Sequence, residues 1–377
     1  MKVKLHFHSP LVLGGRKTTT NYIDSIDYIQ GNVLRAAFAK YILNNCVEYS
    51  PDETVLVNGE RKKNWVYYRA KEGCKDCRLK SLCQKFSTLK FSYFYPEEVD
   101  ILPLTAMVCK LDENHGYIDI LTQEKECPVC GKGGRVESAS GYIRNKKKYS
   151  VKKMFVTKSQ IDNYTKTVKD GRLYSVVSIY ETSPNSNCFT GYIDGIEEED
   201  LNNIDELRVG KYLSVGYGKC TIVPVVDDRK SRQDILEGLR DFDAKYKSFN
   251  KLDNEFNYFA IKLVSDAKLS ISVDLSSYYS TEDYIGKWQE LLKVDNRYEI
   301  YKMYCETFNF RGFDLSRDSE DIREKPVIML EKGSVILFRT KEFFDSVLDY
   351  FMQLKGLGEE NENGFGDYIF YSGGVFQ

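Results

Sequence analysis

The sequence has almost no net charge, because its 54 lysines and arginines nearly balance its 56 aspartates and glutamates and leave a formal charge of -2. This balance excludes a global basic field as the basis for binding a polyanion, so any nucleic-acid surface has to be local. No apolar run approaches the roughly 18–20 residues of a membrane-spanning helix. The first residues, MKVKLHFHSP, alternate in polarity instead of forming the apolar block of a signal peptide. We therefore expect a cytoplasmic globular protein with no membrane partner.

Histidine is also scarce, since the chain has only His6, His8 and His115. General acid–base catalysis near neutral pH usually depends on histidine, so few such sites are open to this chain. Length excludes less: 377 residues, 42% of them hydrophobic, suit two domains of ordinary size or one domain with large insertions.

Cysteine, by contrast, is present ten times. Without an export signal these residues are expected to be reduced thiols. Four are scattered and are expected to be small core residues: Cys46, Cys188, Cys220 and Cys305. The other six lie between residues 74 and 130, and this clustering favours a metal site.

The six clustered cysteines allow several ligand sets. Cys127 and Cys130 form a C-x2-C turn followed by glycine, which is typical of a zinc knuckle. Two cysteines cannot complete a tetrahedral site, so two more ligands are needed, either the upstream pair Cys109 and His115 or a second knuckle at Cys74 and Cys77. A separate cluster, C-x2-C-x5-C, consists of Cys74, Cys77 and Cys83. An iron–sulfur site there lacks a fourth ligand at the usual spacing.

The polarity pattern predicts two successive strand–helix units. Residues 1–10 alternate as a strand with one buried face does. Residues 29–43, IQGNVLRAAFAKYIL, have apolar residues at helical spacing and Asn32 as a candidate cap. The charged stretch 228–254 predicts a connecting helix, and a new strand begins at 256–264. We therefore expect one domain over residues 1–230 and another over 231–377.

Residues 60–150 interrupt this rhythm with charges, paired cysteines and short strand-like pieces, and they predict an insertion in the first domain. Residues 131–172 contain twelve lysines and arginines against three acids. Although the whole chain has almost no net charge, this segment is strongly basic and is the candidate for a local nucleic-acid surface. It is expected to form a basic finger, or else a charged hairpin without a ligand.

Two glycine-rich loops end the two halves. The first has G-x5-G-x-G spacing at Gly210, Gly216 and Gly218, and GLGEENENGFG at residues 356–366 contains the same spacing. Each loop follows a helix and precedes a strand, which is the reverse of the order in a dinucleotide-binding loop, and neither contains the G-K-S or G-K-T of a Walker loop. A helix cap or turn explains one or two of the glycines. The repeated spacing predicts an internal repeat in which a ligand or partner contacts bare main chain.

These features resemble the CRISPR-associated RAMP superfamily. Its first-helix signature, I-P-G-S-x-L-R-G-A-x-A, is similar to residues 29–39, IQGNVLRAAFA, although Gln30 and Ala36 depart from it. The ordered segments LPLTAMVCK, HGYID, CPVCG and VTKSQIDNYTKTVKDGRLYSVVSIY are similar to the Cas5-like RAMP subunit of type III-D effector complexes. The resemblance implies an α+β fold of two tandem ferredoxin-like (RRM-like) domains with glycine-rich loops and a zinc-binding insertion in the first.

The resemblance further implies a non-catalytic subunit of an antiviral type III ribonucleoprotein. Such a subunit holds the repeat-derived 5′ handle of CRISPR RNA and meets target RNA indirectly. Its implied partners are other RAMP backbone subunits and the large polymerase-like subunit.

Both the resemblance and the residue chemistry select candidate site residues. Structural zinc is expected on Cys109, His115, Cys127 and Cys130, because the resemblance includes the C-K and H-G elements. An RNA handle needs backbone N–H groups, lysines or arginines for phosphates, and aromatic rings for bases. The candidate RNA-binding residues are Gly31, Asn32, Arg35, Lys153, Lys158, Arg172, Tyr174, Gly210, Lys211, Tyr212, Gly216, Tyr217, Gly218 and Lys219. The acidic second loop is expected to meet a basic surface on a neighbouring subunit.

The alternative function is a RAMP endoribonuclease that processes CRISPR precursor RNA or cuts target RNA. His6 and His8 share the polar face of the first strand and are the histidine candidates. Asp119 and Asp162 are isolated carboxylate candidates. The sequence places no second catalytic group beside either carboxylate.

Overall fold

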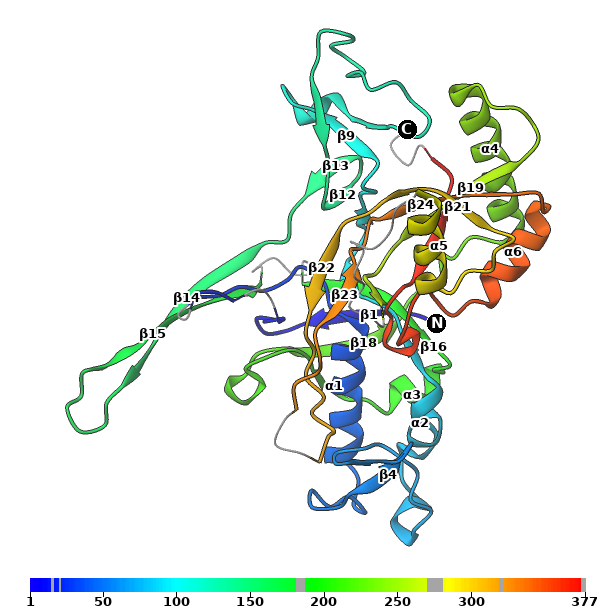
Figure 1. Cartoon of the computed structure of the whole chain (residues 1–377). Coiled ribbons are helices and arrows are strands. Elements are labelled where there is room, and N and C mark those ends of the chain that lie inside the picture. The colour runs from blue at the N-terminus through cyan, green and yellow to red at the C-terminus, as the bar shows by residue number, and fades with distance from the viewer. Residues whose placement is uncertain (15–16, 20–21, 181–186, 270–280, 319–321, 374–377) are drawn as a thin grey trace. The chain divides into compact units, whose positions relative to one another are not determined.

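The structure is a computed structural model of the 377-residue chain, and it describes residues 1–14, 17–19, 22–180, 187–269, 281–318 and 322–373 (Figure 1). Within these ranges the side chains of residues 17–19, 160, 169–173 and 281–284 are not described. The chain divides into two compact units. The first consists of residues 1–97, 151–227 and 313–322, and the second consists of residues 98–150, 228–312 and 323–377.

The first unit is built on an antiparallel sheet centred on β1 (Lys2–Phe7). β1 pairs with β16 (Cys188–Asp194) on one side and with β18 (Lys219–Pro224) on the other. The order is β17-β18-β1-β16-β6, with β7 also paired to β16. The three short strands are β17 (Leu207–Arg208), β6 (Lys90–Phe91) and β7 (Tyr95–Pro96). The expected alternation is present, because Val3, Leu5 and Phe7 are buried and the residues between them are not.

Helix α1 (Gly31–Asn44) follows β1 and buries Leu34, Phe38 and Ile42 in the same core as that face of the sheet. The predicted cap is wrong by two residues: Gln30 is the N-cap and makes no side-chain cap bond. Asn32 lies inside the first turn, and its buried Oδ1 has no hydrogen-bond partner among the described residues. Helix α3 (Glu198–Asn202) precedes β17, and a capping box between Glu197 and Asp200 stabilises its N-terminus.

Two excursions leave this sheet. The first, between α1 and β6, consists of β4 (Val55–Val57), β5 (Glu60–Lys62), η1 (Glu72–Cys74), α2 (Lys80–Lys85) and η2 (Phe86–Thr88). The second is a long antiparallel hairpin of β14 (Lys153–Ile161) and β15 (Val168–Ile179), which extends away from the sheet of the first unit (Figure 1). β15 continues the ladder to β3 (Tyr22–Ile23) and β2 (Lys17–Thr19).

The second unit is centred on β19 (Asn257–Leu263), which is buried along nearly its whole length because both faces of its sheet are covered. The strand order is β21-β24-β19-β25. On one face Phe259 and Ile261 share a core with residues of α5 and α6, and on the other Tyr258 and Ala260 share a core with residues of α4. The elements are α4 (Arg232–Asn250), α5 (Thr281–Leu292), β21 (Glu299–Tyr304), β24 (Val335–Thr340), α6 (Phe344–Gln353) and β25 (Tyr368–Tyr371).

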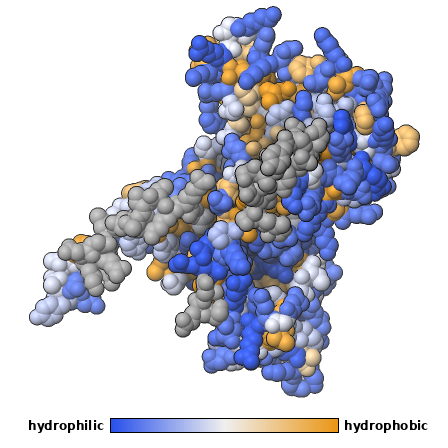
Figure 2. Space-filling view, in the orientation of Figure 1, coloured by the Kyte–Doolittle hydropathy of each residue, from blue (hydrophilic) through white to orange (hydrophobic). Residues whose placement is uncertain are grey.

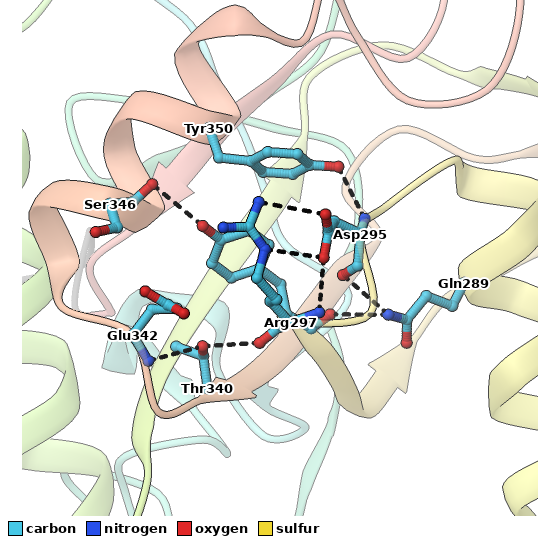
Figure 3. A network of polar contacts seen from close by, with 8 residues as sticks. Gln289, Asp295, Arg297, Thr340, Glu342, Ser346 and Tyr350 are labelled. Carbon is cyan, nitrogen blue, oxygen red and sulfur yellow. Dashed lines mark hydrogen bonds and ion pairs between the residues drawn. The ribbon is translucent and has the colours of Figure 1, made fainter.

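Polar contacts fix the crossing from α5 into β21 against the start of α6 (Figure 3). The Gln289 side-chain amide donates to the carbonyls of Asp295 and Tyr298 at 3.1 and 3.3 Å. The Asp295 N–H donates to the Tyr350 hydroxyl at 2.8 Å, and the Tyr298 hydroxyl donates to the Ser346 carbonyl at 3.2 Å. These bonds satisfy polar groups that the crowded aromatic core would otherwise leave unpaired.

The division into units differs from the predicted boundary in one large piece. Residues 98–150, expected as part of an insertion in the first domain, belong to the second unit. Buried polar contacts hold them there: the Tyr371 hydroxyl donates to Asp119 Oδ2 at 2.5 Å, and the fully buried Lys262 ammonium donates to the Ile101 carbonyl at 2.8 Å. Leu121 completes an apolar cluster with Phe242 and other residues of the second unit. Sequence proximity gave no indication of these partners.

The remaining short strands form small sheets within the second unit. Their orders are β10-β9-β11, β13-β12-β8 and β20-β23-β22. The strands are β8 (Asp100–Ile101), β9 (Ala106–Cys109), β10 (Tyr117–Asp119), β11 (Val136–Ser138), β12 (Tyr142–Arg144), β13 (Lys147–Tyr149), β20 (Ala267–Leu269), β22 (Thr307–Phe310) and β23 (Val327–Leu330).

The predicted basic finger over residues 131–172 is therefore not one element. Its first part forms β11 to β13 in the second unit, and its second part forms the β14–β15 hairpin in the first.

The chain is a mixed α+β protein, and its topology is compatible with ferredoxin-like folds. Each unit has the order strand, helix, strand, strand, helix, strand, and in each the four strands lie in the order fourth, first, third, second. Hydrophilic residues dominate the face drawn in Figure 2. None of the helices in the described residues combines the length and the apolar composition that crossing a bilayer requires.

Candidate nucleic-acid interface and metal site

The first glycine-rich loop, residues 209–219, is here called loop 1, and it folds back onto the segment after β1. The Lys211 N–H donates to the Val12 carbonyl at 2.8 Å, and the Gly218 N–H donates to the Pro10 carbonyl at 2.9 Å. A Cβ on Gly218 would overlap the carbonyl oxygen of Val209. Because this oxygen belongs to the backbone, no side-chain rotation can relieve the overlap. Gly218 is therefore required by close approach of two chain segments.

The second loop, residues 357–367, is here called loop 2, and it repeats this backbone in the second unit. Its Glu359 N–H donates to the Lys268 carbonyl at 2.9 Å, and its Gly366 N–H donates to the Asp266 carbonyl at 2.9 Å. Tyr212 in loop 1 and Glu360 in loop 2 both adopt the left-handed conformation, and each precedes a short 3-10 turn that ends at a left-handed glycine. The predicted internal repeat is thus present in the backbone, although the side chains differ.

The side chains of loop 1 and the hairpin form a small aromatic site around one lysine. Tyr174, Tyr212 and Tyr217 pack together with Val12 and Val176. The ammonium of Lys158, on β14, lies 4.5 Å from the centroid of the Tyr217 ring and 5.9 Å from that of Tyr212. Burial raises the pKa of Tyr212, so its hydroxyl is neutral. We call Lys158, Tyr174, Tyr212 and Tyr217 the aromatic site.

This geometry holds a cation beside loop 1. Tyr217 is only 9% exposed, so its ring packs against Lys158 and is not accessible for a base to stack on. Tyr212 is half-buried, and Lys211 and Ser214 of the same loop are exposed. A phosphate can meet the lysine ammonium here, and a base can reach the partly open Tyr212 ring.

Several other predicted RNA-binding residues have partners inside the first unit. The Arg35 guanidinium donates to the carbonyls of Leu89 and Phe86 at 2.8 and 3.2 Å, and it lies over the Phe86 ring at 5.0 Å. The Lys153 ammonium lies 2.8 Å from the carboxylate of Asp27 and donates to the Ser25 carbonyl at 2.6 Å. These two cations hold protein segments together, and their predicted role in RNA binding stays a prediction.

The remaining predicted residues are spread around loop 1 and the start of α1. Lys219 lies 3.7 Å from Glu206, whose carboxylate offsets part of the positive potential there. Gly216 has open space where a side chain would be, and Gly210 packs against Val12. Gly31 begins α1 and is buried. Arg172 lies in β15, and its side chain is outside the described residues.

The acids of loop 2 already have partners within the second unit. Glu360 pairs with the nearly buried Lys268, and Glu359 pairs with Lys293 at 3.3 Å. Cations of the same unit therefore offset the charge of two acids of the loop. That loop 2 meets a basic surface on a neighbouring subunit stays a prediction.

The four favoured metal ligands are brought together. The donor atoms of Cys109, His115, Cys127 and Cys130 all lie within 4.8 Å of one another. His115 Nδ1 lies 3.5 Å from the sulfur of Cys127 and 3.4 Å from that of Cys130. Typical zinc–sulfur and zinc–nitrogen bonds in a tetrahedral site place such donors roughly 3.6 Å apart. The residues present therefore fit a single tetrahedral metal ion.

Local structure positions each of these ligands. Cys109 ends β9, and His115 ends the turn η3 (Glu113–His115). The Cys130 N–H donates to the Cys127 sulfur at 3.3 Å, as in a knuckle turn. A Cβ on Gly134 would come within 2.5 Å of Cys130 Cβ, so glycine is needed where the chain passes the knuckle.

The surroundings favour a bound cation. His115 Nε2 faces the Asp112 carboxylate at 3.7 Å, which orients the ring with Nδ1 toward the sulfurs. Burial opposes ionisation of Cys127, but backbone N–H groups of Cys130 and Val129 hold its pKa below the usual value. Its hydrogen bond with Cys127 raises the pKa of Cys130 to about 11. Both thiols ionise together only where a cation offsets their mutual repulsion.

The second predicted cluster consists of Cys74, Cys77 and Cys83 and lies in the first unit, whereas Cys127 and Cys130 lie in the second. These three residues line one small cavity together with Cys46. Burial, followed by the nearby Cys46 thiol, raises the pKa of Cys83 to about 11. Sequence reasoning placed Cys46 among the scattered core cysteines, since nothing in the spacing links it to residues 74–83.

The alternative catalytic residues fall into two groups. His6 and His8 lie on β1 and just after it, with ring centroids 4.7 Å apart. Burial, with the nearby charges of His8 and Lys4, lowers the pKa of His6. His8 Nε2 lies 3.0 Å from the Thr221 hydroxyl. These two rings are close enough to act as a pair.

Both carboxylate candidates accept hydrogen bonds that stabilise the local fold. Burial raises the pKa of Asp119, which accepts the Tyr371 hydroxyl and the Leu121 N–H and so holds two chain segments together. Asp162 accepts the N–H groups of Tyr164 and Thr165 at the tip of the hairpin, and these bonds lower its pKa. Both bonding patterns are those of structural carboxylates.

No family model and no curated protein sequence matches the chain. Among solved structures it is similar to a chain of the type III-B Cmr-beta complex bound to cognate target RNA and AMPPnP, with 13% identity over 93% of this chain and 88% of that chain and a TM-score of 0.43. A chain of the same complex bound to cognate target RNA has 12% identity over 98% and 96% and a TM-score of 0.46. A protein described as CRISPR associated protein Cas6 has 11% identity over 98% and 99% and a TM-score of 0.29. Similarity at this level is too distant to assign the chain to a family.

Proposed function

We propose that this chain is a RAMP-superfamily protein of two tandem ferredoxin-like units and a non-catalytic CRISPR RNA-binding subunit of a type III effector complex in the cytoplasm. It holds the repeat-derived 5′ handle and contacts neighbouring RAMP subunits and the large polymerase-like subunit. The Cas5-like subunit of type III-D complexes is the family member it resembles in sequence.

The observation that carries the proposal is the aromatic site on loop 1. A lysine held over tyrosine rings keeps its ammonium beside a loop whose main chain approaches its neighbours closely. Phosphate contacts of this kind position a nucleic acid, and a partly open ring gives a stacking surface for one base. Loop 2 has the same backbone but carries Glu360 where loop 1 has Tyr212. We therefore assign RNA binding to loop 1 and protein packing to loop 2.

Replacing Lys158 with alanine should weaken binding of a repeat-handle RNA about tenfold, which corresponds to roughly 1.4 kcal/mol. The loss of one phosphate contact should also reduce the slope of log affinity against log salt by about 0.7. Fluorescence anisotropy with a labelled handle RNA at several salt concentrations measures both quantities.

The matched control for this experiment is Lys302→Ala. Lys302 also lies over a tyrosine ring, 5.4 Å from the centroid of Tyr301, but it belongs to the second unit and not to loop 1. Its replacement should leave affinity and salt slope unchanged. Equal losses in the two variants would contradict a specific role for the aromatic site.

We propose zinc as the ion held by Cys109, His115, Cys127 and Cys130, in a structural role. Four protein ligands leave no open position for a substrate, which is the arrangement of structural and not catalytic zinc sites. When bound, the ion would join β9, η3 and the knuckle in a segment with a small core of its own.

An endoribonuclease remains the second candidate function because His6 and His8 lie close together. Metal-independent RNA cleavage needs a base and an acid, and His6, with its lowered pKa, is neutral and suited to be the base. The RNA-binding proposal predicts that purified protein leaves a labelled repeat RNA intact in buffer without added metal. Cleavage that is lost in His6→Ala and His8→Ala would replace our proposal with the enzymatic one.

A further inference from the structure

Four cysteines of the first unit gather around one small cavity. Cys46 follows the end of α1, and Cys74, Cys77 and Cys83 come from η1, the loop after it and α2. All four line a cavity of about 20 Å³. A space of this size admits one particle as large as a water molecule. Sequence spacing supplies three of the four cysteines, and the tertiary fold supplies the fourth.

A tight packing contact brings the two segments together. The Gly73 N–H donates to Glu48 Oε1 at 2.8 Å. A Cβ on Gly73 would come within 2.5 Å of Val47 Cγ2, so the two segments approach each other closely here. Because Gly73 adjoins Cys74 and Val47 adjoins Cys46, this contact holds the segments of both cysteines together at the cavity.

Cys77 and Cys83 pack against the apolar core of the first unit, so apolar packing accounts for part of the group. All four are free thiols, and three of them are only half-buried: Cys46, Cys77 and Cys83. The segment between α1 and β6 has only two three-residue strands, two short turns and a six-residue helix. Segments with so little regular structure commonly depend on a metal or a disulfide for their stability.

The charges around the cavity suit a thiolate site. Arg69 and Lys80 line it together with the cysteines. The Arg69 guanidinium is held in place by Glu53 at 3.2 Å and by the Tyr67 ring, 4.2 Å from its centroid. Four thiolates around a divalent ion leave two negative charges, and Lys80, together with Arg69, whose charge is shared with Glu53, offsets part of that excess.

We propose that Cys46, Cys74, Cys77 and Cys83 bind a single zinc ion in a second structural site, separate from the site at Cys109. Four sulfur ligands in a tetrahedral arrangement select zinc or an iron–sulfur centre. The small volume of the cavity favours one ion over a multi-iron cluster. This inference stands apart from the RNA-binding proposal, because neither site depends on a nucleic acid.

Binding requires the four side chains to turn inward. Among the described residues, the group at Cys109 is the one whose donor atoms already lie within 4.8 Å of one another. Each cysteine has one rotatable bond between its backbone and its sulfur, so rotation about Cα–Cβ is the movement that the proposed site requires.

Metal analysis of the purified full chain by mass spectrometry tests the proposal. The wild-type protein should contain two zinc ions per chain, Cys46→Ser one, Cys127→Ser one and the double variant none. Cys188→Ser, which alters a buried cysteine of β16, is the control and should retain two. A Cys46→Ser protein that retains two ions, or iron and sulfide in place of zinc, would overturn the proposal.

A second measurement needs no variant and serves if Cys46→Ser does not fold. The wild-type protein is alkylated before and after treatment with a zinc chelator, and modified cysteines are identified by peptide mass spectrometry. Cys46, Cys74, Cys77 and Cys83 should be protected together in the metal-loaded protein and should become modified together after chelation. Modification of Cys46 before chelation, with the other three protected, would refute its assignment as a ligand.

Discussion

The variant Gly218→Ala is expected to destabilise the first unit by roughly 2–5 kcal/mol. Two costs add in this estimate. Gly218 has φ of +72°, which an alanine adopts only with strain, and its new Cβ would overlap the backbone carbonyl of Val209. Because the opposing atom is backbone, no side-chain rotation can relieve the clash. Urea denaturation followed by tryptophan fluorescence measures the loss.

The same loop provides a matched control for this variant. Gly216 also has positive φ, +95°, but a Cβ there meets nothing within 4 Å. Gly216→Ala should therefore cost only the conformational strain, roughly 1–2 kcal/mol. A Trp288→Phe background leaves Trp65 of the first unit as the only indole reporting the transition. Equal destabilisation by the two variants would show that close approach is not what requires glycine at 218.

The variant Cys127→Ser is expected to have the largest local effect in the second unit. Binding of zinc to four preorganised protein ligands contributes roughly 10 kcal/mol in small zinc domains, so its loss should leave residues 109–136 without a stable fold. Limited proteolysis should then cut this segment rapidly while the rest of the chain resists. Zinc content should fall by one ion per chain in the same sample.

Controls separate the metal from the cysteine itself. Treatment of the wild-type protein with a chelator should reproduce the cleavage pattern of Cys127→Ser, and added zinc should reverse it in the wild type but not in the variant. Cys305→Ser removes a half-buried cysteine elsewhere in the second unit. The protease should cut this variant no faster than it cuts the wild type. Resistance to protease in Cys127→Ser would argue that these four residues stabilise the segment without a metal.

Local patterns predicted much of the fold. The alternation of Val3, Leu5 and Phe7 predicts β1, and the helical spacing after Gly31 predicts α1, because each element buries one face and the period of that face is set by local geometry. The repeated glycine spacing predicts two similar loops, and their main-chain bonds are the same in both units. The zinc-knuckle spacing and the resemblance selected the four residues whose donor atoms the structure brings together.

The charge pattern of the sequence did not identify the partners of single charged side chains. Arg35 and Lys153 are basic residues at promising positions, but each is held by backbone or acidic groups of its own unit. The acids of loop 2 looked available for a neighbouring subunit, yet Lys268 and Lys293 neutralise two of them. Ion pairs between residues far apart in sequence depend on the packing of whole elements.

The sequence by itself determined the periodic elements, the glycine positions that permit two tight loops, and the cysteine pairs within short turns. These features depend on neighbours a few residues away, so residue order is enough to specify them. Only the tertiary structure decided that residues 98–150 belong with the second unit, that Lys158 lies over Tyr217, and that Cys46 joins Cys74, Cys77 and Cys83. Each of these results from the burial of apolar surface by segments distant in sequence, and such burial sets which side chains become neighbours.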